Sequence, residues 1–229
     1  QENGRRARNG KKRKTAFKAN RPYDIMKRRK ETGYVRSGLS GGKETDMTEK
    51  EKMLRGELYR TSDPELVAEH RRALRLCREY NDIDPMDDAE MDRVIRELVN
   101  VEGKQVTVKQ PIRFDYGCHT YFGENVFINY GVNILDVCDV RVGNNVLMGP
   151  NVQLIAATHP TDPQVRLEGL ECGKPVTIGD NVWLGAGVTV CPGVTIGENT
   201  TIGAGSVVTK DIPANCVAVG NPCRVIRKL

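Results

Sequence analysis

The chain has three histidines, and they differ in their surroundings. His159 lies in the segment ATHPTDP, in which prolines stiffen the chain on both sides of Asp162. An imidazole titrates near neutral pH, so such a side chain can move a proton or make a structural contact. His70 stands beside two arginines, which predicts a solvated surface residue, and His119 occupies a turn position. Spacing alone leaves both roles open for His159.

A six-residue period in positions 176–212 predicts the element that must carry the histidine segment. One column of the repeat contains Val176, Val182, Val188, Val194, Thr200 and Ser206, and a second contains Ile178, Leu184, Val190, Ile196, Ile202 and Val208. Three-residue corners rich in Gly, Pro, Asn and Asp separate the apolar positions, as tight turns require. Three short strands of this kind close a coil of about 18 residues, and stacked coils bury one another. We therefore expect a mainly β fold, a parallel β-helix, with a sandwich of short strands as the alternative.

The same period begins earlier and is interrupted once. Strand patterning starts at Val106 and Val108, and a two-residue slip before Val142 predicts a bulge or a wider corner. Between His159 and Pro175 the repeat stops for 17 residues and then restarts. Such an excursion from a regular solenoid is unusual without a use, and it contains the histidine.

Three helices are expected before the coil. Thr48 and Glu51 form a capping box for a short helix with Met53, Leu54 and Leu58. A second helix should begin near the segment SDP (62–64) and run to about residue 80, and a third should span about 85–99. These helices are too few for an independent bundle, so we expect them to cap the open end of the coil.

The positive charge of the chain is concentrated at its start. Residues 1–46 contain 15 Lys/Arg against 5 Asp/Glu, which leaves 20 against 25 in the remainder of a chain with net charge +5. We expect residues 1–46 to be a disordered basic extension, because such a composition cannot bury enough apolar surface. A start at Gln1 suggests a fragment or an extended reading frame. The expected organisation is this extension, a helical cap over 47–102, and a β-helix over 103–229 with an excursion over 159–175.

The composition also restricts the compartment. No apolar run approaches the roughly 18 residues that span a bilayer, so we expect no membrane partner. Seven cysteines form no C-x-x-C pair, which favours buried, reduced thiols in a cytoplasmic protein. Cys118 and Cys138 stand where the repeat requires small inward residues.

Eight short motifs occur in a fixed order along residues 47–229. They are GELY (56–59), FINY (127–130), ILDVC (134–138), ATHP (157–160), GKP (173–175), NVWLG (181–185), VTKD (208–211) and GNPCRVI (220–226). In order and spacing they resemble the maltose/galactoside O-acetyltransferase family, a branch of the left-handed β-helix acyltransferases. The hexapeptide pattern alone indicates only the superfamily, whereas the His-Pro excursion, the Trp-containing corner and the N-terminal helices are specific to this branch.

This resemblance implies a homotrimer with three active sites, acetyl-CoA as donor and a sugar hydroxyl as acceptor. His159 would be the general base of a direct transfer that requires neither a cysteine nucleophile nor a metal. The backbone N–H of Ala186 would stabilise the oxyanion, and Asn129 would position the acceptor. Trp183, the sole tryptophan, would form a wall of the site. From the residues alone, Asn129 could instead form a structural ladder and Trp183 a subunit contact.

The family positions for the two substrates fall on further residues. The acetyl-CoA contacts would be Ala204, Thr209, Lys210, Arg224 and Arg227, although the two arginines could equally be solvated surface charges. The acceptor contacts would be Asp115, Asn129, Glu171 and Thr61. Thr61 stands where the galactoside branch has an acidic residue, which favours a maltose-type acceptor and leaves the natural sugar open.

Other functions of β-helix proteins fit the sequence less well. A γ-type carbonic anhydrase needs three histidine ligands, and only His119 and His159 lie in the coil, so metal catalysis is not expected. A non-catalytic trimeric scaffold, or an acyltransferase of another branch with a non-sugar acceptor, remains as the alternative. Nucleic acid is not expected as a partner, except through residues 1–46.

Overall fold

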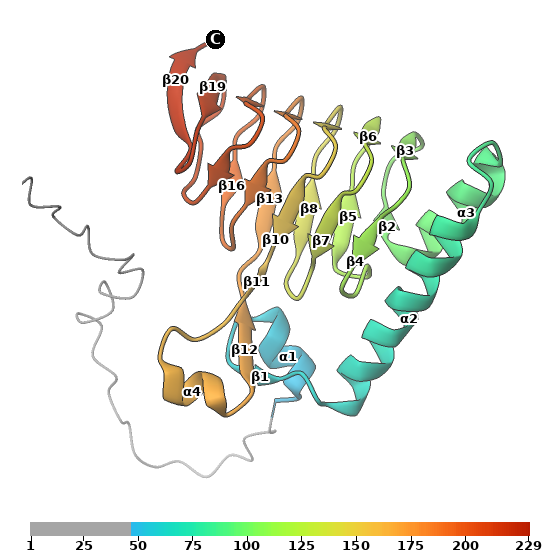
Figure 1. The fold of residues 1–229 in the computed structure, drawn as a ribbon, viewed down its shortest axis with the longest axis vertical. Helices are drawn as coiled ribbons and strands as arrows, with labels where there is room; N and C mark the ends of the chain where they lie inside the picture. The colour runs from blue at the N-terminus through green and yellow to red at the C-terminus, as the bar shows by residue number, and fades with distance from the viewer. Residues whose placement is uncertain (1–46) are drawn as a thin grey trace, which may run out of the picture. The chain divides into compact units, whose positions relative to one another are not determined.

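The computed structural model describes residues 47–229, in which short strands alternate with tight corners to form stacked coils (Figure 1). Residues 1–46, for which we expected disorder, lie outside the described part. The strands form three faces that the chain visits in turn, and each strand pairs in parallel with its equivalent in the next coil. The parallel β-helix expected from the six-residue period is confirmed.

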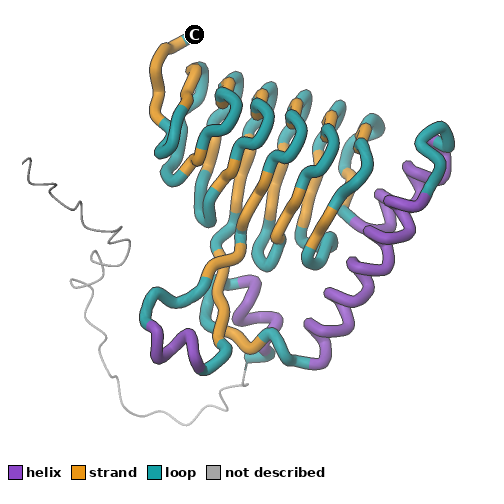
Figure 2. Tube along the Cα trace, viewed as in Figure 1, coloured by secondary structure: helices purple, strands orange, loops and turns teal. Residues whose placement is uncertain are grey.

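Each face of the coil is one parallel sheet (Figure 2). The first face contains β2 (Asn100–Val101), β5 (Thr120–Phe122), β8 (Val140–Val142), β13 (Val176–Ile178) and β16 (Thr195–Ile196). The second contains β3 (Val106–Val108), β6 (Val126–Ile128), β9 (Leu147–Met148), β14 (Trp183–Leu184), β17 (Thr201–Ile202) and β19 (Cys216–Val219), with β20 (Arg224–Lys228) at its edge. The third contains β4 (Arg113–Phe114), β7 (Asn133–Leu135), β10 (Gln153–Ile155), β15 (Thr189–Val190) and β18 (Val207–Val208).

Inward side chains of successive coils stack into columns that fill the coil. On the third face Ile134, Leu154, Val190 and Val208 are in register, and all four are fully buried. Each such side chain contributes about 2 kcal/mol by leaving water. The aliphatic columns therefore stabilise the stack, because no single coil can bury them alone.

The corners adopt backbone conformations that few residues tolerate. Asn125, Asn145, Asn181, Asn199 and Asn215 have φ between 54° and 58° at the corner between the first and second faces. Their side chains also form ladders, as in the 2.9 Å hydrogen bond from Asn181 Nδ2 to Asn199 Oδ1. Asparagine tolerates this left-handed region because its short side chain makes local hydrogen bonds.

The N-terminal helices begin at the predicted caps. α1 (Glu49–Leu54) has the capping box of Thr48 and Glu51, and α2 (Pro64–Asp82) starts with Pro64 after the Asp63 cap. α3 (Asp88–Leu98) starts later than expected, because the Asp87 side chain accepts a hydrogen bond from the backbone N–H of Glu90 and so sets the first turn.

Helices α2 and α3 close the first coil as expected. The Tyr80 hydroxyl donates to the Val108 carbonyl at 2.8 Å. The Asn81 amide donates to the Ile112 carbonyl at 3.0 Å and accepts from the Ile112 N–H at 2.8 Å. The cap therefore satisfies backbone groups that an open coil would leave unpaired. α1 does not share this role, because it packs against the strands Tyr59–Arg60 and Leu170–Gly173. Leu58, which we expected in this helix, lies beyond its C-terminal end and is exposed.

Both ends of the coil extend beyond the predicted pattern. The first strand of the coil, β2, precedes Val106, where strand patterning was expected to begin. At the other end β20 folds back antiparallel on β19 and covers its edge. The slip before Val142 is a wide corner as expected, in which the buried Asp136 carboxylate accepts from Tyr116 N at 2.9 Å and from Thr120 Oγ1 at 3.0 Å.

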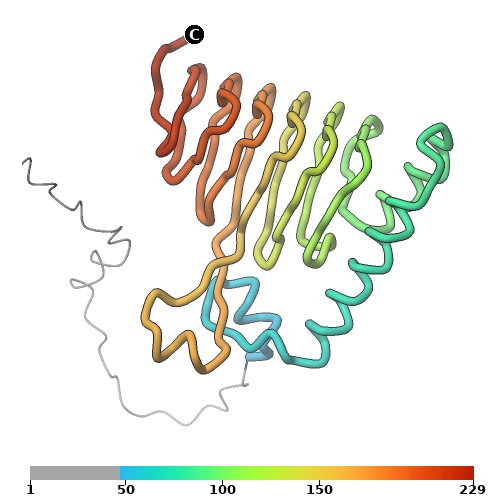
Figure 3. The backbone as a smooth tube through the Cα atoms, in the orientation of Figure 1, coloured from blue at the N-terminus to red at the C-terminus, as the bar shows by residue number. Residues whose placement is uncertain are grey.

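The excursion is a folded unit rather than a loop (Figure 3). It follows β11 (Ala157–Thr158) and contains α4 (Pro163–Leu167) and β12 (Leu170–Gly173), and β11 and β12 pair antiparallel. The N-terminal strand β1 (Tyr59–Arg60) joins the other edge of β12, which gives a three-stranded sheet. A hydrogen bond of 2.9 Å from Lys174 N to Ala156 O closes the base of the excursion.

The seven cysteines all lie in the described part of the chain. All seven cysteines are free, although Cys118 is only partly buried, whereas Cys138 is fully inward. None of the helices in the described part of the chain has the length and apolar character needed to cross a bilayer.

Replacing Asn81 by alanine should weaken the junction between the cap and the coil. The buried N–H and C=O of Ile112 would both lose their partners, so we expect the free energy of unfolding to fall by about 2 kcal/mol or more. Urea unfolding at fixed protein concentration measures the change. Arg78→Ala on the same helix removes an exposed side chain and should change stability by less than about 0.5 kcal/mol. Equal stability of both variants would contradict the capping role of Asn81.

Candidate active site

His159 is presented by the excursion at the corner between the third and first faces. It follows β11 directly, and its side chain is exposed to solvent. The Asp162 side chain accepts from Gln164 N at 2.8 Å and caps α4, while Arg166 Nη1 donates to the Pro160 carbonyl at 2.9 Å. These contacts follow the histidine, and the pairing of Thr158 with Cys172 precedes it, so the segment is held on both sides.

Glu171 lies beside His159 on the neighbouring strand of the same hairpin. Its carboxyl group is partly buried, and burial raises its pKa, whereas the charge of His159 and the Tyr59 hydroxyl lower it. β1 pairs Tyr59 with Glu171 in register. Tyr59 is fully buried, yet its hydroxyl makes no hydrogen bond of ordinary geometry within residues 47–229. The hairpin thus places an acid with a raised pKa next to the imidazole, and β1 places the Tyr59 hydroxyl near that acid.

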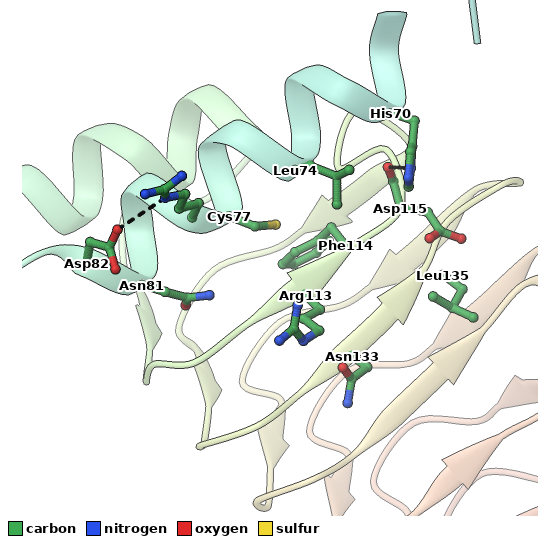
Figure 4. A pocket seen from close by; sticks show the side chains of 11 residues that line it. His70, Leu74, Cys77, Asn81, Asp82, Arg113, Phe114, Asp115, Asn133 and Leu135 are labelled. Carbon is green, nitrogen blue, oxygen red and sulfur yellow. Dashed lines mark hydrogen bonds and ion pairs between the residues drawn. The ribbon is translucent and has the colours of Figure 1, made fainter. Parts of the chain in front are cut away.

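A cavity of about 360 Å³ lies between α2 and the third face (Figure 4). His70, Arg113, Asp115 and Asn133 are among its polar lining residues. His70 is partly buried with its Nδ1 2.8 Å from the Asp115 carbonyl oxygen, so the sequence-based assignment of a solvated surface residue is wrong. The face of α2 that contains His70 is turned toward the coil, which its arginine neighbours did not indicate.

Asp115 belongs to the same corner as the excursion. Burial raises the pKa of its carboxyl to about 6, aided by the charges of Asp136 and Glu171 and opposed by His70. Glu171, like Asp115 expected on the acceptor side, therefore lies near enough to raise the pKa of Asp115. Thr61, the third expected acceptor residue of this region, is exposed in the turn after β1.

Asn129 and Ala186 lie at the other corner of the third face, where it meets the second. The N–H groups of Asn129 and Gly149 donate to Met148 and Leu184, so successive coils stack here. The coils approach closely: a Cβ on Gly185 would lie 2.6 Å from the backbone nitrogen of Ala204. The N–H of Ala186 donates to no protein acceptor within the described residues, and its position is exposed.

Exposed apolar side chains surround this second corner. Trp183 projects outward from β14 with 54% of its surface exposed, in register with the exposed Leu147 of β9. Tyr130, next to Asn129, is also exposed. An apolar patch of this kind commonly marks a surface that a partner or ligand covers.

The third face separates the two groups of predicted site residues within one chain. From Asn129 the chain crosses β7 before it reaches the corner at Asp136, where the excursion side begins. His159, Asp115 and Glu171 are therefore brought together, whereas Asn129, Ala186 and Trp183 form a separate group.

The expected donor residues lie on the C-terminal coils. Ala204 is exposed at the corner of Ala186, one coil further on. Thr209 and Lys210 follow β18 at the corner of the excursion, and the Thr209 hydroxyl is buried without a hydrogen-bond partner in the described part of the chain. Arg224 and Arg227 are exposed on β20.

Sequence reasoning missed Tyr59, His70 and Asp136 as polar groups of this region. Tyr59 is part of the GELY motif, but the motif does not show that its strand pairs with β12. The sequence alone therefore predicted no role for the Tyr59 hydroxyl. His70 is placed by a contact between α2 and the coil, Tyr59 by the pairing of β1 with β12, and Asp136 by a contact within the coil. Each contact joins residues far apart in the sequence, so no local spacing indicates it.

Comparison with known proteins agrees with the fold and the motifs. Residues 52–102 match the model of the maltose acetyltransferase hexapeptide capping motif, and residues 175–210 match that of the bacterial transferase hexapeptide with six repeats. The galactoside O-acetyltransferase of Escherichia coli is 40% identical over 78% of this chain and 88% of its own length.

Two solved structures show the same fold over most of the chain. A maltose O-acetyltransferase from Clostridium difficile is 52% identical, with a TM-score of 0.79 over 80% of this chain and 98% of its own. A hexapeptide-repeat acetyltransferase from Vibrio cholerae, solved with acetyl coenzyme A, is 36% identical, with a TM-score of 0.75 over 80% and 99%. The chain therefore belongs to the maltose/galactoside O-acetyltransferase family of hexapeptide-repeat acetyltransferases.

Proposed function

We propose that this acetyltransferase moves an acetyl group from acetyl-CoA directly to a sugar hydroxyl, with His159 as general base. The observation that carries the proposal is the hairpin of the excursion, which presents an exposed imidazole beside the partly buried Glu171. A wholly structural histidine would not need a solvent-facing position in an otherwise regular coil. A non-sugar hydroxyl acceptor is the alternative for the same chemistry.

The proposed reaction has a single transfer step. His159 takes the proton of the acceptor hydroxyl as its oxygen attacks the thioester carbonyl carbon. The tetrahedral oxyanion accepts a hydrogen bond from the backbone N–H of Ala186, which has no protein acceptor in the described residues. The carbon–sulfur bond then breaks, and the coenzyme A thiolate leaves with the proton from His159. No covalent acyl-enzyme forms, so no cysteine takes part.

Glu171 has a positioning role in this scheme in addition to an acceptor contact. Its negative charge next to His159 stabilises the imidazolium that forms during the attack, as the orienting acid does in other histidine-based sites. Tyr59 from β1 lies on the far side of the carboxylate and links the N-terminal segment to the site.

The separation of the two groups of site residues supports a homotrimer with shared active sites. In a closed cyclic assembly one surface of each chain meets a different surface of the next. The corner with Asn129 and Ala186 of one chain would meet the corner with His159 of its neighbour. The exposed apolar Trp183 and Leu147 beside the first corner support burial there in an interface.

The two substrates are assigned to opposite parts of this shared site. For acetyl-CoA, the Thr209 hydroxyl, which has no partner among residues 47–229, offers a hydrogen bond. Charge for the phosphates comes from Lys210, Arg224 and Arg227, and Ala204 leaves space at its corner. For the acceptor, the cavity beside α2 leads to the polar groups of Asp115, and Glu171, Asn129 and Thr61 complete the set. We assign the protein to the cytoplasm, because its free thiols suit a reducing compartment.

Replacing His159 by alanine should remove the general base. We expect the rate of coenzyme A release with a sugar acceptor to fall by about 10² to 10⁴, since base assistance contributes that factor. Thr161→Ala, an exposed position on the same excursion, is the matched control and should keep the parent rate. An unchanged rate in the His159 variant, with the assembly intact, would disprove the general-base assignment.

A mixed-oligomer experiment tests whether the site is shared. Co-expression of His159→Ala and Asn129→Ala chains should restore about a quarter of the parent activity, because one site of each mixed trimer has both residues intact. Each variant expressed alone should be nearly inactive. If co-expression restores nothing, while mixed assemblies are confirmed by mass spectrometry, the two residues act within one chain and the shared site is wrong.

Asp115→Asn should reveal the cost of burying the acceptor-side carboxylate. Its pKa of about 6 in the folded protein exceeds the ordinary aspartate value of 3.8, so its ionised form destabilises the fold as pH rises through that window. The melting temperature of the variant relative to the parent should therefore be higher at pH 8 than at pH 4.5. Asp82→Asn, a highly exposed position near the cavity, should show no such difference. A pH-independent offset in Asp115→Asn would contradict the raised pKa.

A further inference from the structure

A histidine, a cysteine and a glutamate converge where α2 meets the first coil, apart from the transfer chemistry. Glu69 lies on α2, and Cys118 and His119 lie at the corner between β4 and β5. One ligand atom of each residue lies within 4.8 Å of the other two. All cysteines and histidines of the chain fall within residues 47–229, so the first 46 residues contain no thiol or imidazole that could belong to this cluster.

His119 is held in an orientation suited to a metal ligand. Its side chain is 6% exposed, and Nδ1 lies 2.9 Å from the carbonyl oxygen of Asp136. A carbonyl can only accept, so Nδ1 has the proton and Nε2 has a free lone pair. A backbone carbonyl bound to the second ring nitrogen is the usual support of a metal-binding histidine.

Glu69 supplies an oxygen that lacks a partner. Its Oε1 accepts a hydrogen bond from Lys50 Nζ on α1, whereas its Oε2 is buried with no hydrogen-bond partner within the described residues. A buried carboxylate oxygen left without a donor is costly, and a cation would remove that cost. Lys50 engages the other oxygen and also contacts Glu65, so it leaves Oε2 free for a metal ion.

The ligand set selects the ion. Thiolate and imidazole favour zinc over magnesium or calcium, which prefer oxygen ligands alone. Zinc bonds of about 2.0 to 2.3 Å place tetrahedral ligand atoms about 3.3 to 3.8 Å apart, so the side chains need to close by about 1 Å. Cys118 is partly buried and free, and on binding it would release its thiol proton to solvent.

We propose that Glu69, Cys118 and His119 bind a structural zinc ion, with water as the fourth ligand. The ion would fasten α2 to the corner that follows Asp115, where His70 and Tyr116 already pack edge to face with ring centroids 5.9 Å apart. It stabilises the fold beside the acceptor cavity and takes no part in acetyl transfer. The proposal is therefore independent of the proposed function.

Metal analysis of the full chain tests the proposal. After incubation with zinc and dialysis against buffer, the parent should retain one zinc per chain, and its melting temperature should rise with zinc. Cys118→Ser and His119→Gln should bind zinc at least about tenfold more weakly. Cys191→Ser, which removes another partly buried thiol at a different corner, should behave like the parent.

Cobalt substitution and a third variant make the outcome decisive. Cobalt in the parent should give a near-ultraviolet sulfur-to-metal charge-transfer band that is absent in Cys118→Ser. Glu69→Gln keeps the shape of the side chain, so it tests the carboxylate even if another variant fails to fold. It should weaken zinc binding, while its circular dichroism spectrum stays the same as that of the parent. Zinc retention equal in the parent and Cys118→Ser, or a cobalt band that persists without Cys118, would overturn the site.

Discussion

Hydrogen bonding between successive coils is the constraint on which the rest of this structure depends. Equivalent strands pair in register, as in the bond of 3.0 Å from Trp183 N to Thr200 O. Outward side chains therefore stand at repeated intervals of about 4.8 Å, the spacing of paired strands. Close approach at corners such as Gly185 preserves this interval. A rigid column of this kind can hold Asn129, Ala186 and Ala204 at fixed separations without any loop.

The excursion adds chemistry to the coil without breaking this pairing. The contact between Lys174 and Ala156 closes its base, so the chain resumes the next coil in register. The hairpin that leaves the coil has edges that need partners, and β1 from the N-terminal segment supplies one. The N-terminal residues thus have two tasks: α2 and α3 cap the first coil, while α1 and β1 support the strand next to His159.

The distribution of polar groups is the reason that the proposed mechanism requires the proposed assembly. Within the described residues, each chain has an imidazole with its acid at one corner and a backbone N–H without an acceptor at another, so in the proposed reaction neither half would suffice. The apolar surface near Trp183 would cost free energy in an isolated chain and is useful only when covered. The proposed zinc ion at Glu69, Cys118 and His119 would stabilise the junction of α2 with the coil, beside the cavity that we propose for the acceptor.

The sequence by itself determined the elements that depend on local chemistry. The six-residue period, the caps at Thr48 and Asp63, and the interruption at His159 were all readable, because turn residues and apolar spacing act over a few positions. The resemblance to the family then predicted a set of site residues. Only the tertiary structure decided the pairing of β1 with β12, the burial of His70, the fold-back of β20 and the approach of Glu69 to Cys118. Each of these contacts joins elements that are far apart in the sequence. Burial against such a distant element leaves no periodic pattern in the sequence from which it could be predicted.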